Sequence, residues 1–254
     1  MHSILFSIGP FHVYGYGFMI AVGIICAFTI GCFLAKRSGL DDDALFSMGL
    51  VGIVGGIIGA KLLYYIVEFP SIIADPSILL NFGEGFVVYG GLIAGFLSPL
   101  IYTRIKKLSF LPYIDCAVPG VAFAQGCGRI GCFLAGCCYG TPYDGPFAVQ
   151  FPEGSLAPSD TTLFPVQLVE AICLLILAIV LAVLDLKKSY PHTIAIYFIV
   201  YGILRFLLEY VRYDAVRGHL LALSTSQWIS LGFVVGTVCY LIRAAHKQKK
   251  DMVP

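Results

Sequence analysis

Seven long apolar runs, separated by short loops, constrain this 254-residue chain more than any other feature. A helix that crosses a bilayer needs about 20 mostly apolar residues. Hydrophobic residues make up 59% of the chain and charged residues only 12%. The runs lie at roughly 12–35, 44–67, 86–103, 110–135, 164–186, 191–211 and 226–243. They predict an all-α, polytopic membrane protein, a seven-helix transmembrane bundle that forms a single domain over residues 1–254.

The lysines and arginines predict how the bundle is oriented, because these residues are enriched in cytoplasmic loops. Eleven of the sixteen follow odd-numbered runs. They are Lys36, Arg37, Arg104, Lys106, Lys107, Lys187, Lys188, Arg243, Lys247, Lys249 and Lys250. Only Arg212 and Arg217 lie in a loop on the other side, so we expect the N-terminus outside and the C-terminus in the cytoplasm. The net charge of +1, with no basic face, argues against a nucleic-acid partner.

Six of the charged residues inside the predicted spans are candidates for a polar interior, because a charge within a span is costly unless it faces one. They are Lys61, Asp115, Arg129, Glu170, Arg205 and Glu209. The rise of about 1.5 Å per helical residue places all of them except Asp115 near the outer leaflet. For Asp115, at the inner face, we expect a structural role.

The charges of the sixth span predict an anion-binding pocket. Arg205 and Glu209 are four residues apart and share a helix face, which Arg212 continues. Guanidinium binds phosphate through paired donors and keeps its proton. A lipid with an anionic phosphate headgroup therefore suits this pocket, while the alternative is a salt-bridge network that only locks the helices together.

The stretch GCGRIGCFLAGCCYG, Gly126 to Gly140, combines Arg129 with four cysteines. Its glycines permit a bent or broken helix that would expose backbone N–H groups to an anion. Its cysteines, Cys127, Cys132, Cys137 and Cys138, admit three readings: small packing residues, an outer disulfide or a thiol relay. No C-x-x-C pair and no nearby histidine supports a metal or thioredoxin-like site, so we expect packing or one disulfide.

Six further motifs accompany this stretch in order: FHVYGYGFMIAVG, GGIIGAKLLYY, VVYGGLIAG, FPVQLVE, YGILRFLLEYVR and STSQWISL. Together they resemble the prolipoprotein diacylglyceryl transferase family over nearly the whole chain. The resemblance implies transfer of the diacylglyceryl group of phosphatidylglycerol to the lipobox cysteine thiol of a prolipoprotein, with release of glycerol phosphate. It implies a site facing the outer leaflet of the bacterial plasma (inner) membrane, among membrane lipid, with no metal or diffusible cofactor.

The same resemblance implies roles for individual residues. The essential arginines of the family fall on Arg129 and Arg205, and Tyr89 and Glu209 are candidates for the base that deprotonates the thiol. Substrate contacts are implied for Tyr14, Lys61, Gly90, Gly91, Gly128, Gly140, Gln167, Glu170 and Arg212. A donor such as Arg129 can stabilise the charge of the departing phosphate by about 3–4 kcal/mol in the transition state.

The chain departs from the family at several polar positions. Tyr89 replaces the histidine of the usual His-Gly-Gly, Cys132 an asparagine, Cys137 an acidic residue and Phe164 a histidine, while Lys61 stands where arginine is common. Two readings follow. The chain is either an active transferase whose acceptor thiol is deprotonated by Tyr89, by Glu209 or by the substrate, or a paralogue that uses the same lipid pocket for another acceptor or reaction.

Two further classes of function are less well supported by the sequence. A transporter would share the intramembrane charges, but its charges would line a route through both leaflets and its halves would show a repeat. A thiol-redox protein would use the cysteines, but a recognisable redox motif is missing. The outer loop at about 137–163, rich in glycine, proline, serine and threonine, is long enough to cover an outer-leaflet pocket, as a lid or as a connector.

Overall fold

The computed structural model describes residues 4–9, 11–81, 83–187, 192–213, 219–220 and 223–251. Lys188 and Arg217, used above for the orientation, lie outside the described residues, as do the side chains of Lys247, Lys249 and Lys250.

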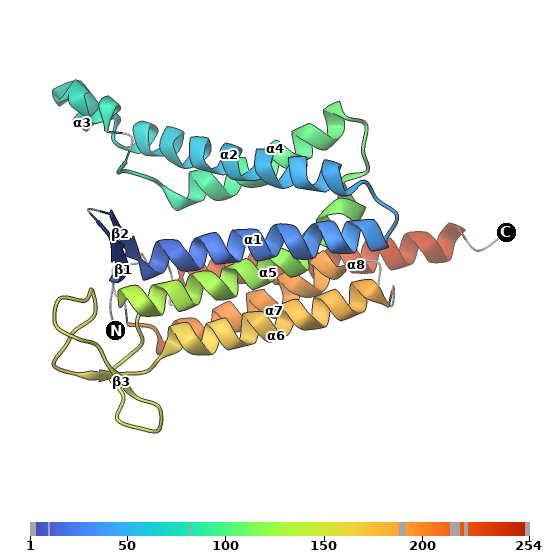
Figure 1. Ribbon diagram of the computed structural model, residues 1–254. Helices are drawn as coiled ribbons and strands as arrows, with labels where there is room; N and C mark the ends of the chain where they lie inside the picture. Colours follow the sequence, from blue (N-terminus) through green and yellow to red (C-terminus); the bar gives the residue numbers. More distant parts are fainter. Residues whose placement is uncertain are drawn as a thin grey trace. The chain divides into compact units, whose positions relative to one another are not determined.

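Eight α-helices make up most of the described chain (Figure 1). They are α1 (Gly15–Arg37), α2 (Asp42–Val67), α3 (Phe69–Ala74), α4 (Val88–Ile105), α5 (Phe110–Ala135), α6 (Val166–Leu186), α7 (Thr193–Leu208) and α8 (Thr225–Asp251). Two 3-10 helices, η1 (Pro76–Leu80) and η2 (Glu209–Val211), follow α3 and α7. The prediction of a helical protein is confirmed.

Six of the described helical segments are long and apolar enough to cross a membrane: α1, α2, α4, α6, α7 together with η2, and α8 up to Ala244. The protein is therefore a multi-pass membrane protein by helix length and composition. Helix α5 is 26 residues long. It carries Asp115, Gln125 and Arg129 among its apolar residues, which lowers its hydropathy below that of the other six.

Three short antiparallel strand pairs, which the sequence analysis did not predict, lie in the segments that flank the helices. They are β1 (Ile4–Ile8) with β2 (Phe11–Tyr14), β3 (Val149–Gln150) with β4 (Thr162–Leu163), and β5 (His219–Leu220) with β6 (Leu223–Ser224). The first pair corrects the predicted start of the first span: residues 12–14 belong to β2. Gly9, with φ of 59°, makes the turn that pairs Ile8 with Phe11, and the helix begins only at Gly15.

Contacts between Cα atoms divide the chain into two compact units. The large unit contains Met1–Ile30 and Asp115–Pro254, and the small unit contains Gly31–Ile114.

Within the small unit, α2 and α4 pack closely along a line of glycines. A Cβ atom on Gly90 would overlap the carbonyl oxygen of Gly59, and one on Gly59 would overlap the side chain of Ala94. The Ser98 hydroxyl donates to the carbonyl oxygens of Ala94 and Val51, at 2.6 and 3.2 Å. Small residues of this kind allow helix backbones to approach within a membrane.

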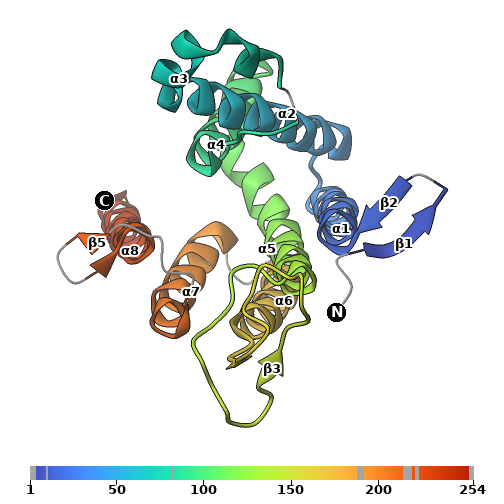
Figure 2. The same ribbon diagram turned by 90° about the vertical axis from the view of Figure 1, so that its left-hand side faces the viewer.

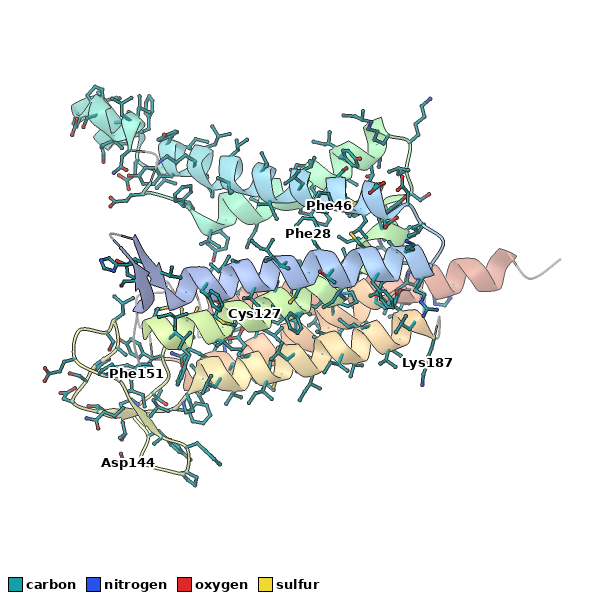
Figure 3. All side chains as sticks on the ribbon, in the orientation of Figure 1. Phe28, Phe46, Cys127, Asp144, Phe151 and Lys187 are labelled. Atoms are coloured by element: carbon teal, nitrogen blue, oxygen red, sulfur yellow. The ribbon has the colours of Figure 1, made fainter. Side chains whose placement is uncertain are left out.

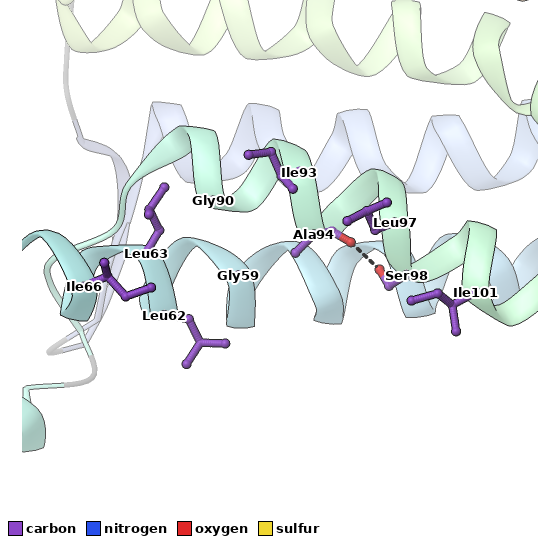
Figure 4. Close-up of a pocket in the computed structure, with 10 residues that line it drawn as sticks. All are labelled: Gly59, Leu62, Leu63, Ile66, Gly90, Ile93, Ala94, Leu97, Ser98 and Ile101. Carbon is purple, nitrogen blue, oxygen red and sulfur yellow. Dashed lines mark hydrogen bonds between the residues drawn. The ribbon is translucent and has the colours of Figure 1, made fainter.

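An apolar groove of about 360 Å³ runs along this helix pair (Figure 4). Its lining is Leu62, Leu63, Ile66, Ile93, Leu97 and Ile101, with the small residues Gly59, Gly90, Ala94 and Ser98 between them. No charged side chain lines the groove. Its surface is therefore of the kind that hydrocarbon chains cover.

We expect Gly59→Ala to destabilise the small unit, because the added methyl group meets Ala94 Cβ and lies 2.6 Å from the Gly90 carbonyl oxygen. The expected loss is about 1–3 kcal/mol, as for overpacked cores, measured as a lower unfolding midpoint in detergent micelles. Gly232→Ala, a helical glycine with open space around its Cβ position, is the matched control. It should be neutral or stabilising by up to about 1 kcal/mol, and equal losses in both variants would contradict the packing argument.

Within the large unit, α1, α5, α6, α7 and α8 form the helical body (Figure 2). Glycines again set the close approaches. A Cβ on Gly120 of α5 would lie 2.5 Å from the Ala27 carbonyl oxygen of α1, and one on Gly202 of α7 would lie 3.2 Å from the Ser230 carbonyl oxygen of α8. The start of α1, the end of α5, the start of α6 and the end of α7 lie at the same end of this unit (Figure 1).

The opposite end of the large unit contains Lys187, at the end of α6 (Figure 3).

Asp115, for which the sequence analysis expected a structural role, contacts the start of α7. Its carboxylate accepts hydrogen bonds from the Thr193 hydroxyl, at 3.1 Å, and from the backbone N–H of Ile194, at 2.9 Å. These donors belong to the first turn of α7, whose N–H groups need such partners.

The loop at 137–163 folds onto the end of α5 instead of extending freely. Phe151, labelled in Figure 3, is 2% exposed and packs with Ala157 and Leu163. Its ring also meets Phe133 of α5, with centroids 5.8 Å apart. The loop therefore has a small hydrophobic core of its own, which fixes the backbone around Cys137 and Gly140.

Candidate active site

Arg129 of α5 forms an ion pair with Glu170 of α6 inside the large unit. The Arg129 Nε atom lies 3.1 Å from Glu170 Oε1, and the two side chains are 19% and 2% exposed. Helix α5 continues without interruption past this arginine, so the helix is not broken at the glycines around it. Regular helical hydrogen bonding already uses the N–H groups that a broken helix would have released.

Arg205 and Glu209 form the second buried ion pair, at the junction of α7 and η2. Arg205 Nη1 lies 2.7 Å from Glu209 Oε2, with side-chain exposures of 9% and 10%. Arg205 also donates from Nη2 to the Ser226 hydroxyl at 3.3 Å, and the Ser224 hydroxyl donates to Glu209 Oε1 at 2.7 Å. The pairing follows from the four-residue spacing recognised in the sequence.

The start of α8 holds this second pair in place. The Ser224 N–H donates to Gln227 Oε1 at 3.0 Å and the Gln227 N–H donates to the Ser224 hydroxyl at 3.2 Å, which is a capping box. The Gln227 Nε2 group reaches the Phe206 carbonyl oxygen of α7 at 3.5 Å. One serine thus begins α8 and contacts the carboxylate that pairs with Arg205.

We expect Ser224→Ala to destabilise both the start of α8 and the contact with Glu209. Loss of the cap costs about 1 kcal/mol, and Glu209 loses one of its hydrogen-bond donors. The unfolding midpoint in detergent should fall measurably, whereas Ser71→Ala, at an exposed position in α3, should stay within about 0.5 kcal/mol of the parent protein. Equal stability of the two variants would show that the capping box does not hold the junction.

The segment Cys137–Gly140 lies between the start of α6 and the end of η2. Gln167 Nε2 donates to the Cys137 carbonyl oxygen at 2.9 Å, and Gly140 forms an antiparallel bridge with Arg212. A Cβ on Gly140 would overlap the Phe164 carbonyl oxygen, so the close approach requires glycine. These contacts bring Gly140, Gln167 and Arg212 together, although the three residues belong to three separate sequence motifs.

Two tyrosines of α7, which the sequence analysis did not select, connect α7 to α5. The Tyr197 hydroxyl donates to Gln125 Oε1 at 2.6 Å, and the Tyr197 and Tyr201 rings stack at 5.6 Å. Tyr201 is also close enough to Arg129 to interact with it electrostatically. Tyr201 is the first residue of the YGILR motif and lies one helical turn before Arg205, so the sequence could have identified it as a site residue.

Two buried acceptor atoms of α6 can accept further hydrogen bonds. Within the described residues, Gln167 Oε1 and Glu170 Oε1 accept no hydrogen bond, although the latter belongs to the ion pair. Gln167 is 1% exposed and Glu170 2%. A buried acceptor left without a donor costs about 1–3 kcal/mol, so a bound ligand that offers hydroxyl groups would be stabilised here.

Four of the predicted site residues belong to the small unit: Lys61, Tyr89, Gly90 and Gly91. Lys61 Nζ donates to the carbonyl oxygens of Asn81 and Glu84, both at 2.6 Å, and lies 5.0 Å from the ring centroid of Tyr64. Tyr89, in the first turn of α4, is 49% exposed. Gly91 lies against α2, where a Cβ would be 3.3 Å from a carbonyl oxygen.

Two other predicted site residues, Tyr14 and Gly128, have open surroundings in the large unit. Tyr14 ends β2 and is 55% exposed. Gly128, next to Arg129 in α5, has no described atom within 4 Å of its Cβ position.

Three cysteines lie together near Arg129. The sulfur atoms of Cys132, Cys137 and Cys138 are all within 4.8 Å of one another. Hydrogen bonding with the thiols of Cys132 and Cys137, and the nearby charges of Arg212 and Arg129, lower the pKa of Cys138 well below its usual range, while hydrogen bonding with Cys132 and Cys138 raises the pKa of Cys137. The sequence analysis grouped these three cysteines with Cys127, but their spacing C-x4-C-C does not match a familiar metal motif and did not indicate a metal site.

Comparison with known proteins identifies the family. The model of the prolipoprotein diacylglyceryl transferase family matches residues 3–243. The phosphatidylglycerol–prolipoprotein diacylglyceryl transferase of Clostridium tetani is 42% identical over 250 residues, covering 98% of this chain and 100% of the relative. The enzyme of that name, number 2, in Clostridium perfringens is 40% identical over 240 residues, covering 94% and 93%.

A more distant relative gives the same result. The phosphatidylglycerol–prolipoprotein diacylglyceryl transferase of Pasteurella multocida is 33% identical over 250 residues, covering 95% of this chain and 89% of the relative. The family model extends over nearly the whole chain, and its range spans every motif described above. The chain belongs to the prolipoprotein diacylglyceryl transferase family.

Proposed function

We propose that this protein transfers the diacylglyceryl group of phosphatidylglycerol to the cysteine thiol of a prolipoprotein lipobox, forming a thioether and releasing glycerol phosphate. The observation that carries the proposal is the pair of buried arginine–carboxylate contacts at one end of the large unit, Arg129 with Glu170 and Arg205 with Glu209, in a chain of this family. Buried charges of this kind mark functional sites in membrane proteins.

The headgroup of phosphatidylglycerol has one phosphate and two hydroxyl groups, and the site offers partners for both. The guanidinium groups of Arg129 and Arg205 suit the phosphate. The buried acceptor Gln167 Oε1 suits a hydroxyl, because no described residue donates a hydrogen bond to it. Glu170 Oε1, which lies 3.1 Å from Arg129 Nε, can accept a second hydrogen bond. A headgroup with an ammonium group could also donate to these acceptors, but its positive charge would be disfavoured beside the two arginines.

The chemical step makes one bond and breaks one. The thiolate sulfur attacks the glyceryl carbon, the bond between that carbon and the phosphate oxygen breaks, and its electron pair leaves with glycerol phosphate. Negative charge grows on the departing oxygen, so Arg129 and Arg205 act as preorganised cationic donors. Because their partners are carboxylates held by buried contacts, the two arginines need little reorganisation during the reaction.

The proton of the acceptor thiol must also be removed, since the thiolate is the nucleophile. We propose Tyr89 or Glu209 for this step. Glu209 already accepts from Ser224 through Oε1 and pairs with Arg205 through Oε2, so both of its oxygens are occupied. Transfer rates of Tyr89→Phe and Glu209→Gln distinguish the two, because loss of the proton acceptor should cost about 100-fold or more.

We further propose contacts to substrate from the remaining residues of the motifs. Arg212 and Gly140 adjoin each other at the bridge beside α6, where Gln167 also lies. Tyr14 and Gly128 have the open surroundings that a lipid headgroup or peptide could occupy. For Lys61, Tyr89, Gly90 and Gly91 of the small unit, the support is the resemblance of their motifs to the family.

For the membrane arrangement, we propose that α5 is the seventh span beside the six apolar helices, in a single functional domain. The lysine and arginine distribution supports an N-terminus outside and a C-terminus in the cytoplasm. The site then faces the outer leaflet of the bacterial plasma membrane, among lipid, with the loop at 137–163 on the side where a secreted prolipoprotein arrives.

The test is a transfer assay with purified protein, phosphatidylglycerol labelled in its diacylglyceryl group and a lipobox peptide. Thioether product and glycerol phosphate should form in equal amounts. A peptide with serine in place of the lipobox cysteine should give neither, because a hydroxyl is a much poorer nucleophile. Lipid binding without either product would reject the transfer and leave a paralogue with another acceptor, while lipid movement without covalent product would indicate a transporter.

A further inference from the structure

The end of α5 brings Cys132 and Cys137 together by its backbone geometry. The Cys137 N–H donates to the Cys132 carbonyl oxygen at 3.0 Å, the Gly136 N–H donates to the Phe133 carbonyl oxygen at 3.2 Å, and Gly136 has φ of 72°. These are the two hydrogen bonds and the left-handed glycine of a Schellman motif. That motif places the residue after the glycine against the residue five positions earlier, where an apolar contact is usual. Here both positions are cysteines.

The third cysteine joins them from a strained backbone position. Cys138 has φ of 60°, in the left-handed region that costs a residue with a Cβ about 1–2 kcal/mol. Strain of this kind persists only where the surroundings enforce it and is concentrated at functional sites. It places the Cys138 sulfur within 4.8 Å of the other two sulfur atoms.

Neighbouring elements hold this cluster from both sides. Gln167 of α6 donates to the Cys137 carbonyl oxygen, and the Tyr139 carbonyl oxygen accepts from the Tyr213 N–H at 3.2 Å. Cys132 is buried, whereas Cys137 and Cys138 are partly exposed. The backbone of the cluster is thus held on two sides, and two of its three cysteines are partly accessible.

We propose that Cys132, Cys137 and Cys138 bind one thiophilic divalent metal ion of the Zn²⁺ class, and that the fourth coordination position receives the acceptor thiol. Tetrahedral Zn²⁺ with bonds of about 2.3 Å to sulfur needs sulfur–sulfur separations of about 3.8 Å. The observed separations, at most 4.8 Å, require shifts of about 1 Å or less, which side-chain rotation provides. Three protein ligands with one open position is the arrangement of reactive rather than structural zinc sites.

The local charge suits such an ion. Three thiolates and one divalent cation leave a net charge of −1, and a fourth thiolate makes it −2. Arg212, which forms an antiparallel bridge with Gly140 two residues after Cys138, adds a positive charge to this segment and can balance part of this charge.

The second half of the proposal rests on the proposed thiol acceptor. A thiol that coordinates a divalent metal is deprotonated, so its proton leaves to solvent before the attack and the sulfur remains a nucleophile. The same lone pair then forms the bond to the glyceryl carbon, and glycerol phosphate departs with the electron pair of the broken bond. The site would therefore reduce the demand on Tyr89 or Glu209 as a base.

Metal binding is tested on the purified full-length protein in detergent, reduced and then freed of excess reductant without oxygen. Co²⁺ serves as the probe, because its absorption reports thiolate ligands. We expect one Co²⁺ per chain, displaced by Zn²⁺. Cys137→Ser and Cys138→Ser should each weaken binding at least about tenfold, whereas Cys239→Ser, an exposed cysteine of α8, should bind as the parent protein does.

The open position is tested in the same cuvette without phosphatidylglycerol, so that no transfer occurs. A lipobox peptide should change the Co²⁺ spectrum, and the peptide with serine in place of cysteine should not. No Co²⁺ binding by the reduced parent protein, or equal binding by all cysteine variants, would overturn the metal site. Binding with an unchanged spectrum would overturn the fourth position only. Absence of thioether in the separate transfer assay, with metal bound, would reject the proposed function and leave the metal site standing.

Discussion

Arg129→Ala should lower the rate of diacylglyceryl transfer by about 10²–10³-fold. Removal of a single preorganised donor to a developing oxyanion has an effect of this size. The change also leaves Glu170, 2% exposed, as a buried carboxylate without its cation. Loss of one partner of a buried pair destabilises a protein by about 3–5 kcal/mol. The measurements are the initial rate with labelled phosphatidylglycerol and the unfolding midpoint in detergent.

A second variant separates the two effects of Arg129. In Arg129→Ala/Glu170→Gln, no unpaired charge remains buried, so most of the lost stability should return while transfer stays low. Arg104→Ala, at an exposed position near the end of α4, is the matched arginine control and should change neither quantity. Recovery of transfer together with stability in the double variant would show that Arg129 is only a partner for Glu170.

Arg205→Ala should have the largest combined effect on stability and transfer. Glu209 would lose the cation 2.7 Å away, at a site where both side chains are about nine-tenths buried. We expect a loss of about 3–5 kcal/mol, together with a fall in transfer of about 10²-fold or more. Thermal unfolding in detergent and the transfer assay measure the two results independently.

Replacing the whole pair by apolar residues gives the companion experiment. Arg205→Met/Glu209→Leu should fold as well as the parent protein or better, because such replacements of buried ion pairs are often neutral or stabilising. The variant should nevertheless be inactive, since no guanidinium remains to meet the phosphate. A stable and active double variant would assign the pair a purely structural role. Arg205→Lys, which keeps the charge but loses the planar donors, should be active at less than about a tenth of the parent rate.

The helices could be predicted from the sequence because each apolar run is long and its boundaries are marked by charge or proline. The range predicted for α5, 110–135, agrees with the observed helix. The hairpin at Ile4–Tyr14 could not be predicted in the same way, because its apolar residues merge with those of the first span. Alternation over four or five residues is a weak signal beside a run of twenty.

The site could be predicted residue by residue but not contact by contact. Arg205 and Glu209 were paired correctly, because a spacing of four is a local property of one helix. The contact between Arg129 and Glu170 joins two helices across 41 positions of the chain, and only the packing of α5 on α6 reveals it. Their common depth in the membrane was the only sign in the sequence.

The meeting of the three cysteines in one proposed metal site was not predicted, for a different reason. A search for C-x-x-C pairs overlooks it, because the residues meet through a helix end and not through a metal motif. Gly136 could have indicated part of the cluster. A glycine just after a helix predicts that the next residue, here Cys137, contacts the residue five positions before it, here Cys132. The sequence rule was available for Cys132 and Cys137, whereas the position of Cys138 depends on its unusual backbone conformation.

The low hydropathy of α5 has a consequence for synthesis of the protein. A charged residue such as Arg129 opposes insertion of an isolated helix, by about 2.5–3.5 kcal/mol when it lies at the helix centre. Its partner Glu170 lies in α6, which leaves the ribosome later. On the proposed seven-span arrangement, α5 would therefore enter the bilayer stably only as a helical hairpin with α6. The ion pair that prepares the site for phosphate would then also make the two helices leave the translocation channel together.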